Sequence, residues 1–283
     1  GQQLVRHPAI RAVGFTGSFA GGTALARIAA ERTDPIPVFA EMGSTNPIFL
    51  LPNALDTLAA ELSERIFASI TASNGQMCTC PGLIFAPRGD GCEAVLRAIA
   101  KSMNEAAPQT MLNPRVRHTF AKRAGDVSAV AGVDVRGGSP LAAHRTAEGA
   151  EQHQPGEPIR SSPVLLRTTF DTFRKNPTLH DEVFGPLAIM VVCDNDQQLV
   201  DAAAMIHGSL TGTIWAGGTD GELAQRVQNI LEQRVGRLIY NGVPTGVEVS
   251  PSMVHGGPFP ATNQPHTTAV GAFAVTRWTR PIC

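Results

Sequence analysis

Apolar residues along this chain recur at two spacings, and the two alternate. Short apolar runs, typical of buried strands, alternate with stretches in which apolar residues recur every three or four positions, as they do on one face of a helix. The alternation predicts an α/β fold with a largely parallel sheet. Residues 134–160 are rich in glycine, proline and polar side chains, so we interpret them as a surface loop. Strands are predicted at 10–15, 82–86, 164–168, 187–193, 213–216 and 237–240, and helices at 197–206 and 223–231, among others.

One predicted helix ends directly before a pair of cysteines. Apolar residues recur at helical spacing from Leu55 to Ile66. Asn53 is a candidate N-cap, because its side chain can accept a hydrogen bond from a backbone N–H of the first turn. The helix is expected to end near Asn74 and Gly75, which places the sequence "NGQMCTC" in the loop beyond it.

The composition fits a globular protein and argues against several classes of partner. The chain has 283 residues, of which 43% are hydrophobic and 17% charged, enough for one large domain or two smaller ones. Its net charge of -1 provides no basic surplus for a nucleic acid. No apolar run reaches the ~20 residues that span a bilayer, and the first residues lack the pattern of a signal peptide. We therefore expect neither a nucleic-acid nor a membrane partner.

The five cysteines indicate the cellular compartment of the protein and the chemistry that its thiols could perform. Their odd number argues against a disulfide framework, so we expect a cytoplasmic protein; a mature periplasmic chain is the alternative. Cys78 and Cys80 stand in a Cys-x-Cys spacing with no second Cys/His pair at ligand spacing, which argues against a zinc site, and we expect no metal. A disulfide between such close neighbours would gain little entropy. A buried structural thiol and a nucleophile held in a loop remain open on this evidence.

Four motifs occur in a fixed order along the chain: "VGFTGSFAGG", "FAEMGSTNP", "NGQMC" and "DEVFGPL". This ordered set resembles the aldehyde dehydrogenase superfamily. The stretch that begins "YNGVPTGVEVSPSMVHGGPFPATN" resembles one branch of it, the NADP-linked 2,5-dioxovalerate (α-ketoglutaric semialdehyde) dehydrogenases. The resemblance covers essentially the whole chain and implies an aldehyde dehydrogenase-like catalytic domain.

The resemblance implies a role for each matching residue. Cys78 matches the catalytic nucleophile, which forms a thioester with the substrate, and Glu41 matches the general base that activates water against that thioester. Glu182 matches the carboxylate that holds the ribose hydroxyls of NADP or NAD, and Phe184 matches the ring beside the nicotinamide. Taken alone, Glu41 would more often be a solvated or capping carboxylate, and "DEVFGP" an ordinary turn. We interpret His255, in "VHGGPF", as a structural or backbone-positioning residue, with a contact to the substrate as the alternative.

The turn "FTGS" is the other part of the implied cofactor site. Gly17 and Ser18 match the turn past which the nicotinamide and phosphate portions of the cofactor run. A helix is predicted to begin after Ser18, and the N-terminus of a helix offers backbone N–H groups to a phosphate. Without the resemblance, "FTGS" would be only a turn.

The resemblance also divides the chain into three parts. Residues 1–42 match the end of a Rossmann-like nucleotide-binding domain, 43–263 the catalytic domain, and 264–283 a segment that returns toward the nucleotide-binding part. Members of the superfamily carry a long N-terminal portion before the first motif, so we interpret the chain as a catalytic fragment of an enzyme that is a homo-oligomer in its full form.

Three functions follow as hypotheses. The first is oxidation of a small semialdehyde, such as 2,5-dioxopentanoate, to the acid with NADP or NAD. The second is an inactive truncated remnant or a non-catalytic subunit of an oligomer. The third is a thiol hydrolase or acyltransferase that uses Cys78 and Glu41; it is disfavoured because the sequence shows no Cys–His partnership and because the first and last of the four motifs would then have no purpose.

Overall fold

The computed structural model describes residues 1–140 and 159–283, and its largest element is a seven-stranded sheet. Neighbouring strands are parallel except at one edge, where β6 runs antiparallel to β8. This confirms the predicted α/β fold with a mostly parallel sheet. The strands, in their order across the sheet, are β11 (Val235–Tyr240), β10 (Ser209–Trp215), β3 (Ile48–Leu50), β4 (Leu83–Pro87), β9 (Leu187–Cys193), β8 (Val164–Thr169) and β6 (Asp134–Gly138).

Helices cover both faces of this sheet, because successive side chains of a strand point to opposite faces. In β3, Ile48 and Leu50 belong to the core beneath α3 and α4, whereas Phe49 belongs to the core on the other face, with α5, α7, α8 and α9. The described helices are α1 (Gln2–Arg6), α2 (Phe19–Ala30), α3 (Pro52–Thr71), α4 (Asp90–Glu105), α5 (Pro114–Ser128), α7 (Phe170–Lys175), α8 (Asp196–Met205) and α9 (Gly221–Leu231), with 3₁₀ turns η1 (Ala72–Gly75), η3 (Pro177–His180) and η4 (Ala272–Trp278).

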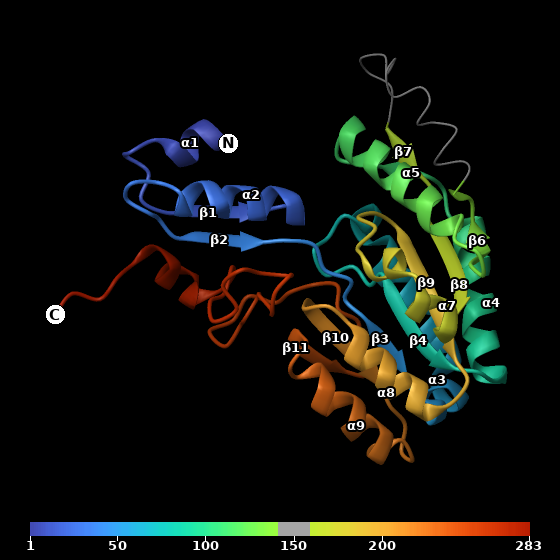
Figure 1. The fold of residues 1–283 in the computed structure, drawn as a ribbon. Coiled ribbons are helices and arrows are strands. Elements are labelled where there is room, and N and C mark those ends of the chain that lie inside the picture. Colours follow the sequence, from blue (N-terminus) through green and yellow to red (C-terminus); the bar gives the residue numbers. More distant parts are fainter. Residues whose placement is uncertain (141–158) are drawn as a thin grey trace.

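The N-terminal residues form a smaller unit beside the large sheet (Figure 1). Its strands β1 (Val13–Thr16) and β2 (Val38–Glu41) are parallel and pack with α1 and α2 around a core of their own. A third pair of short strands, β5 (Gln109–Thr110) and β7 (Arg160–Ser161), is antiparallel. The chain passes from β2 directly into β3, so Glu41 lies at the point where the small unit joins the large sheet.

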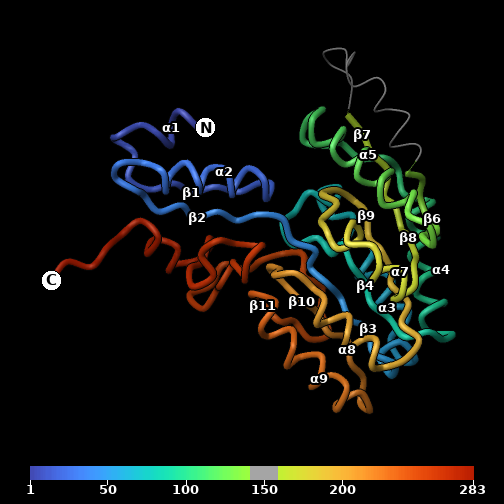
Figure 2. Tube along the Cα trace, in the orientation of Figure 1, coloured from blue at the N-terminus to red at the C-terminus, as the bar shows by residue number. Residues whose placement is uncertain are grey.

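The C-terminal segment after β11 runs back to the N-terminal unit, and both termini lie on the side of the molecule away from β6 (Figure 2). The backbone N–H of Met42 donates to the carbonyl of Ala261 at 2.7 Å, and the Ala40 N–H donates to the side chain of Asn263 at 2.8 Å. These hydrogen bonds join the C-terminal segment to β2, so residues near 255 lie beside residues near 41. Within the described residues, no helix has the length and apolar character to cross a membrane.

Two local predictions were wrong, and one helix was not predicted. Residues 134–138 form the edge strand β6 instead of a loop; a strand paired on one side only and exposed on the other shows no apolar pattern. The rest of the predicted loop, 141–158, lies outside the described residues. Helix α5 was missed; its N-cap is Asn113, whose side chain accepts a hydrogen bond from the Val116 N–H.

The second wrong prediction concerns the start of α3. The N-cap is Leu51, and Asn53 lies inside the first turn. The cap comes from elsewhere in the chain: the buried carboxylate of Asp220 accepts hydrogen bonds from the backbone N–H groups of Asn53 and Ala54, at 3.0 and 3.1 Å. Since Asp220 is distant in sequence, no local signal reveals this cap.

Candidate active site

A run of left-handed residues carries the chain from α3 to Cys78. Helix α3 ends at Thr71, slightly earlier than predicted, and Ser73, Asn74 and Gly75 then adopt φ values of +49°, +54° and +66°. At Gly75 a side chain would collide with the backbone of Gly185, since an added Cβ would lie 2.2 Å from its carbonyl carbon. Glycine is therefore required here both for its conformation and for the close approach of two backbones.

The buried side chain of Asn74 fixes this turn from one side. Its amide Nδ2 donates to the carbonyl of Gln109 at 2.9 Å and contacts the hydroxyl of Ser161 at 3.0 Å. These two partners belong to the short sheet β5–β7, so the turn before Cys78 is held by tertiary structure as well as by its own backbone.

A second buried asparagine fixes the cysteine loop from the other side. Asn46 is fully buried with φ +44°, and its Nδ2 donates to the carbonyls of Cys78 and Cys80, both at 2.9 Å. Its Oδ1 accepts from the hydroxyls of Ser44 and Thr211, at 2.8 and 3.0 Å. This amide therefore clamps the backbone of both cysteines to strands of the large sheet. Asn46 lies within the motif "FAEMGSTNP", but the sequence does not show that its side chain reaches the backbone of the cysteine loop.

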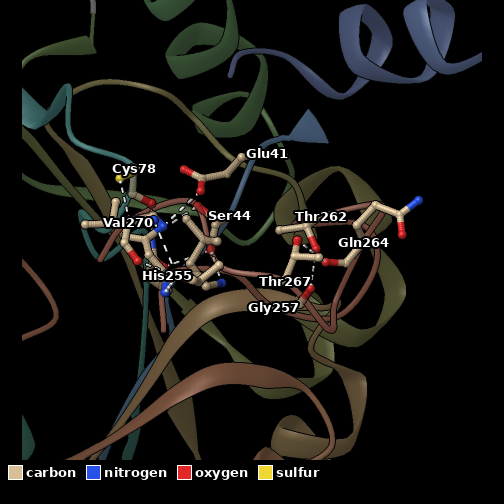
Figure 3. A network of polar contacts seen from close by, with 12 residues as sticks. Glu41, Ser44, Cys78, His255, Gly257, Thr262, Gln264, Thr267 and Val270 are labelled. Atoms are coloured by element: carbon tan, nitrogen blue, oxygen red, sulfur yellow. Dashed lines mark hydrogen bonds and ion pairs between the residues drawn. The ribbon is translucent and has the colours of Figure 1, made fainter. Parts of the chain in front are cut away.

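Cys78, His255 and Glu41 form a chain of contacts in the centre of the site (Figure 3). Sγ of Cys78 lies 3.3 Å from Nε2 of His255, and Nδ1 of the same ring lies 2.9 Å from Oε2 of Glu41. Glu41 and His255 are 4% and 8% exposed, so both are shielded from solvent. The sequence showed no Cys–His partnership, and the structure brings these two side chains into contact. His255 is 177 residues from Cys78 and 214 from Glu41, a separation at which sequence spacing carries no signal.

The electrostatics of the two neighbouring thiols differ. Hydrogen bonds to Cys78 and then to Glu41 raise the pKa of His255 to about 10, against burial, which lowers it. Burial raises the pKa of Cys80 to about 11, so that thiol is neutral near neutral pH. Its Sγ donates to the carbonyl of Ala72 at 3.8 Å. The site therefore contains one thiol that contacts a basic partner and one that is kept protonated by its surroundings.

Proximity alone does not make these three groups a metal site. One ligand atom from each of Glu41, Cys78 and His255 lies within 4.8 Å of the others. Cys78 and Glu41 contact opposite nitrogens of the same ring, so one ion bound by the ring could take only one of them as a second ligand. A zinc site has at least three protein ligands, so this arrangement fits hydrogen bonding better than metal binding.

Glu182 and Phe184 lie beside the cysteine loop. Both line a cavity together with Met77 and Cys80, which flank Cys78 in the chain. Burial raises the pKa of Glu182 to about 7, and a hydrogen bond from the backbone N–H of Ser44 opposes this rise. Phe184 is 36% exposed, an unusual state for a phenylalanine next to a core. A carboxylate that accepts hydroxyl protons, next to an exposed ring, fits the ribose and nicotinamide of a dinucleotide.

Gly17 and Ser18 reach the site from the N-terminal unit. The backbone N–H of Gly17 donates to the carbonyl of Glu41 at 3.0 Å, because β1 and β2 pair with Thr16 opposite Glu41. Ser18 is the N-cap of α2, as the predicted helix start requires, and its Oγ accepts from the Gly21 N–H at 3.2 Å. The structure thus brings "FTGS" to Glu41 and "DEVF" to the loop that contains Cys78.

Comparison with known proteins adds independent information. The family model described as "Aldehyde dehydrogenase family" matches residues 1–258. The chain is 38% identical to an alpha-ketoglutaric semialdehyde dehydrogenase of Acinetobacter baylyi over 287 aligned residues, covering 100% of this chain and 52% of the relative. It is 37% identical to alpha-ketoglutaric semialdehyde dehydrogenase 2 of Azospirillum brasilense, covering 100% of this chain and 51% of that protein. The chain therefore spans about half the length of these relatives.

Solved structures agree with the fold. An aldehyde dehydrogenase from Bacillus cereus superposes with a TM-score of 0.75 at 20% identity, over 98% of this chain and 52% of that one. A gamma-glutamyl-gamma-aminobutyraldehyde dehydrogenase from Burkholderia cenocepacia gives a TM-score of 0.74 at 16% identity, with 98% and 52% covered.

Proposed function

Because this chain belongs to the aldehyde dehydrogenase family, we propose that it carries the thiol centre at which a semialdehyde is oxidised to a carboxylic acid. One observation supports this most: Cys78 and Glu41, which belong to different units of the fold, meet around one buried imidazole. A nucleophile and a carboxylate in a shielded site are the two groups that a thioester mechanism requires.

In the proposed mechanism, the thiolate of Cys78 attacks the aldehyde carbon and forms a tetrahedral hemithioacetal. Aldehyde dehydrogenases use NAD(P), and the bound nucleotide supplies the hydride acceptor. Glu182 would hold its ribose hydroxyls, with Phe184 beside the nicotinamide. Gly17 and the N-terminus of α2 would lie along its phosphates. The resulting thioester on Cys78 is cleaved by a water molecule that Glu41 deprotonates, which releases the acid and the free thiol.

We propose α-ketoglutaric semialdehyde (2,5-dioxopentanoate) as the substrate and NADP as the preferred nucleotide, with NAD as the alternative. The names of the two relatives support the substrate, and the resemblance to one branch supports NADP. An anionic substrate also suits the charges near the thiol. Burial lowers the pKa of Arg237 and the neighbouring Cys78 raises it, so this guanidinium lies within electrostatic range of the nucleophile. Its Nη2 donates to the carbonyl of Pro244 at 2.8 Å, which fixes its position.

The test uses the native polypeptide that contains this chain, with 2,5-dioxopentanoate and NADP or NAD. Formation of reduced nucleotide is followed from the first turnover. Glu41→Gln is expected to give a burst of about one reduced nucleotide per site and then slow turnover, because acylation survives while water activation fails. Cys78→Ala is expected to give no burst. Full steady-state activity of Cys78→Ala would refute the proposed function. No aldehyde oxidation by the wild type would favour the hypothesis of an inactive remnant.

The substrate class has its own test. Arg237→Met is expected to raise the KM for the anionic semialdehyde about tenfold, and to change the KM for an uncharged aldehyde of equal length much less. An equal change in KM for both aldehydes would show that Arg237 does not recognise the carboxylate of the substrate.

The Cys78–His255 contact supports a second candidate, a thiol hydrolase. The chain would then hydrolyse an activated ester without nucleotide. Steady hydrolysis combined with no aldehyde oxidation would favour this candidate over the first.

A further inference from the structure

The imidazole of His255 contacts the nucleophile, and the mechanism above does not use it. We propose that His255 is a catalytic residue that takes the proton of Cys78 on Nε2, while Glu41 holds the ring through Nδ1. The proposal rests on the proposed function in one respect: Cys78 is the nucleophile. It adds the group that generates the thiolate.

The carboxylate of Glu41 determines which nitrogen of His255 is free. An ionised carboxylate only accepts hydrogen bonds, so the 2.9 Å contact between Nδ1 and Oε2 requires the hydrogen on Nδ1. In the neutral ring, Nε2 then carries a lone pair and can only accept. The 3.3 Å contact between Sγ and Nε2 is therefore a hydrogen bond from the thiol to the imidazole, the arrangement that precedes proton transfer.

The backbone around His255 leaves the ring little freedom to move away. The His255 N–H donates to the hydroxyl of Thr268 at 2.8 Å, and the His255 carbonyl accepts from the Ala269 N–H at 2.8 Å. The following Gly257 packs against β10 so closely that an added Cβ would lie 2.4 Å from the carbonyl oxygen of Ser209. A ring anchored on both sides and aimed at a thiol has the preorganisation that a proton acceptor needs.

The step balances without any further reactant. The Sγ–H bond breaks and its proton moves to Nε2, which gives an imidazolium. The electron pair left on Sγ forms the bond to the aldehyde carbon, and the π pair of the carbonyl moves to its oxygen. The imidazolium then returns the proton to that oxygen, so the ring is neutral again.

The charges around the three groups favour the ion pair. Among the described residues, the other titratable groups with an electrostatic interaction with the triad are Arg237 and Cys80, with Cys78, and Arg277, with Glu41. Both guanidinium groups stabilise the anion beside them. The hydrogen bonds to Cys78 and to Glu41 raise the pKa of His255, which favours the ring as the acceptor of the thiol proton.

The test measures the alkylation of Cys78 by iodoacetamide, resolved by peptide mass, as a function of pH. The variant is His255→Asn, because the asparagine amide can still donate to Glu41 from the position of Nδ1 but has nothing at Nε2. The matched control is His180→Asn; the ring of His180 is half-buried and is hydrogen-bonded as well, to the carbonyl of Phe173 at 2.8 Å.

A free thiol with a pKa of about 8.5 is only about 3% ionised at pH 7. Loss of the imidazole is therefore expected to slow alkylation of Cys78 about 10- to 30-fold near pH 7, with recovery toward the wild-type rate near pH 10. Labelling of Cys80 serves as the internal reference and is expected to stay unchanged, as is Cys78 labelling in His180→Asn. If His255→Asn does not fold, His255→Gln is measured with the same expectations.

Equal rates and equal pH profiles for the wild type and His255→Asn would overturn the proposal. A loss of equal size at every pH would show a structural role instead, and would overturn it too. Labelling needs neither aldehyde nor nucleotide, so its outcome is separate from that of the proposed function. A pH effect in the labelling without any aldehyde oxidation would support the role of His255 and refute the proposed dehydrogenase activity.

Discussion

The clamp formed by Asn46 gives the sharpest test of how the cysteine loop is held. In Asn46→Asp the side-chain shape and its tolerance of positive φ are kept, but the NH₂ group becomes an oxygen. The carbonyls of Cys78 and Cys80, each 2.9 Å from Nδ2, then lose their donor and face an oxygen instead. Each unsatisfied buried polar group costs about 1–3 kcal/mol, so we expect a loss of roughly 2–6 kcal/mol in the free energy of unfolding.

The matched control is Asn241→Asp. Asn241 also has a positive φ, +49°, but it is exposed. Its Oδ1 accepts from the Ala216 N–H at 2.9 Å, a bond that aspartate keeps, and its Nδ2 makes only a 3.2 Å contact to the Ala216 carbonyl. We expect this variant to lose less than about 1 kcal/mol.

Urea unfolding followed by the fluorescence of the buried Trp215 measures both variants. A protonated aspartate has one O–H to donate, so the loss in Asn46→Asp is expected to be smaller at acidic than at alkaline pH. Alkylation of Cys78 in the folded variant is expected to change as well, since the loop loses its anchor. If Asn46→Asp were no less stable than Asn241→Asp, the clamp would contribute nothing and the reasoning would fail.

Two further outcomes are expected. Brief iodoacetamide treatment near neutral pH should label Cys78 before Cys80, whose pKa is raised to about 11 by burial; label on Cys80 alone would contradict this. Burial raises the pKa of Glu182 from 4.5 to about 7, so the folded state binds this proton more tightly than the unfolded state. The resulting gain in the free energy of unfolding is fully present below pH 4.5 and is lost as the pH rises through 7. Glu182→Gln should therefore stabilise the protein at alkaline relative to acidic pH in urea unfolding, and an equal effect at both would be evidence against it.

Several features of the fold and site are local in the sequence and could be predicted from it. The alternation of apolar runs and helical spacing predicted the α/β fold, because burial between two helix layers demands that pattern. The helix that ends before "NGQMC" placed Cys78 in a loop, and Ser18 at the start of a helix was likewise visible. In these cases the residues that determine the structure are neighbours in the chain.

Only the tertiary structure decided which groups meet. His255 reaches Cys78 because the C-terminal segment returns to β2, and Asn46 clamps a loop 32 residues further along the chain. Asp220 caps α3 from 167 residues away, where the sequence suggested Asn53. Hydrophobic periodicity records which face of an element is buried, but not which distant polar group satisfies a given hydrogen bond. That pairing depends on how the elements pack, and here the packing brings a histidine that was expected to be structural into contact with Cys78.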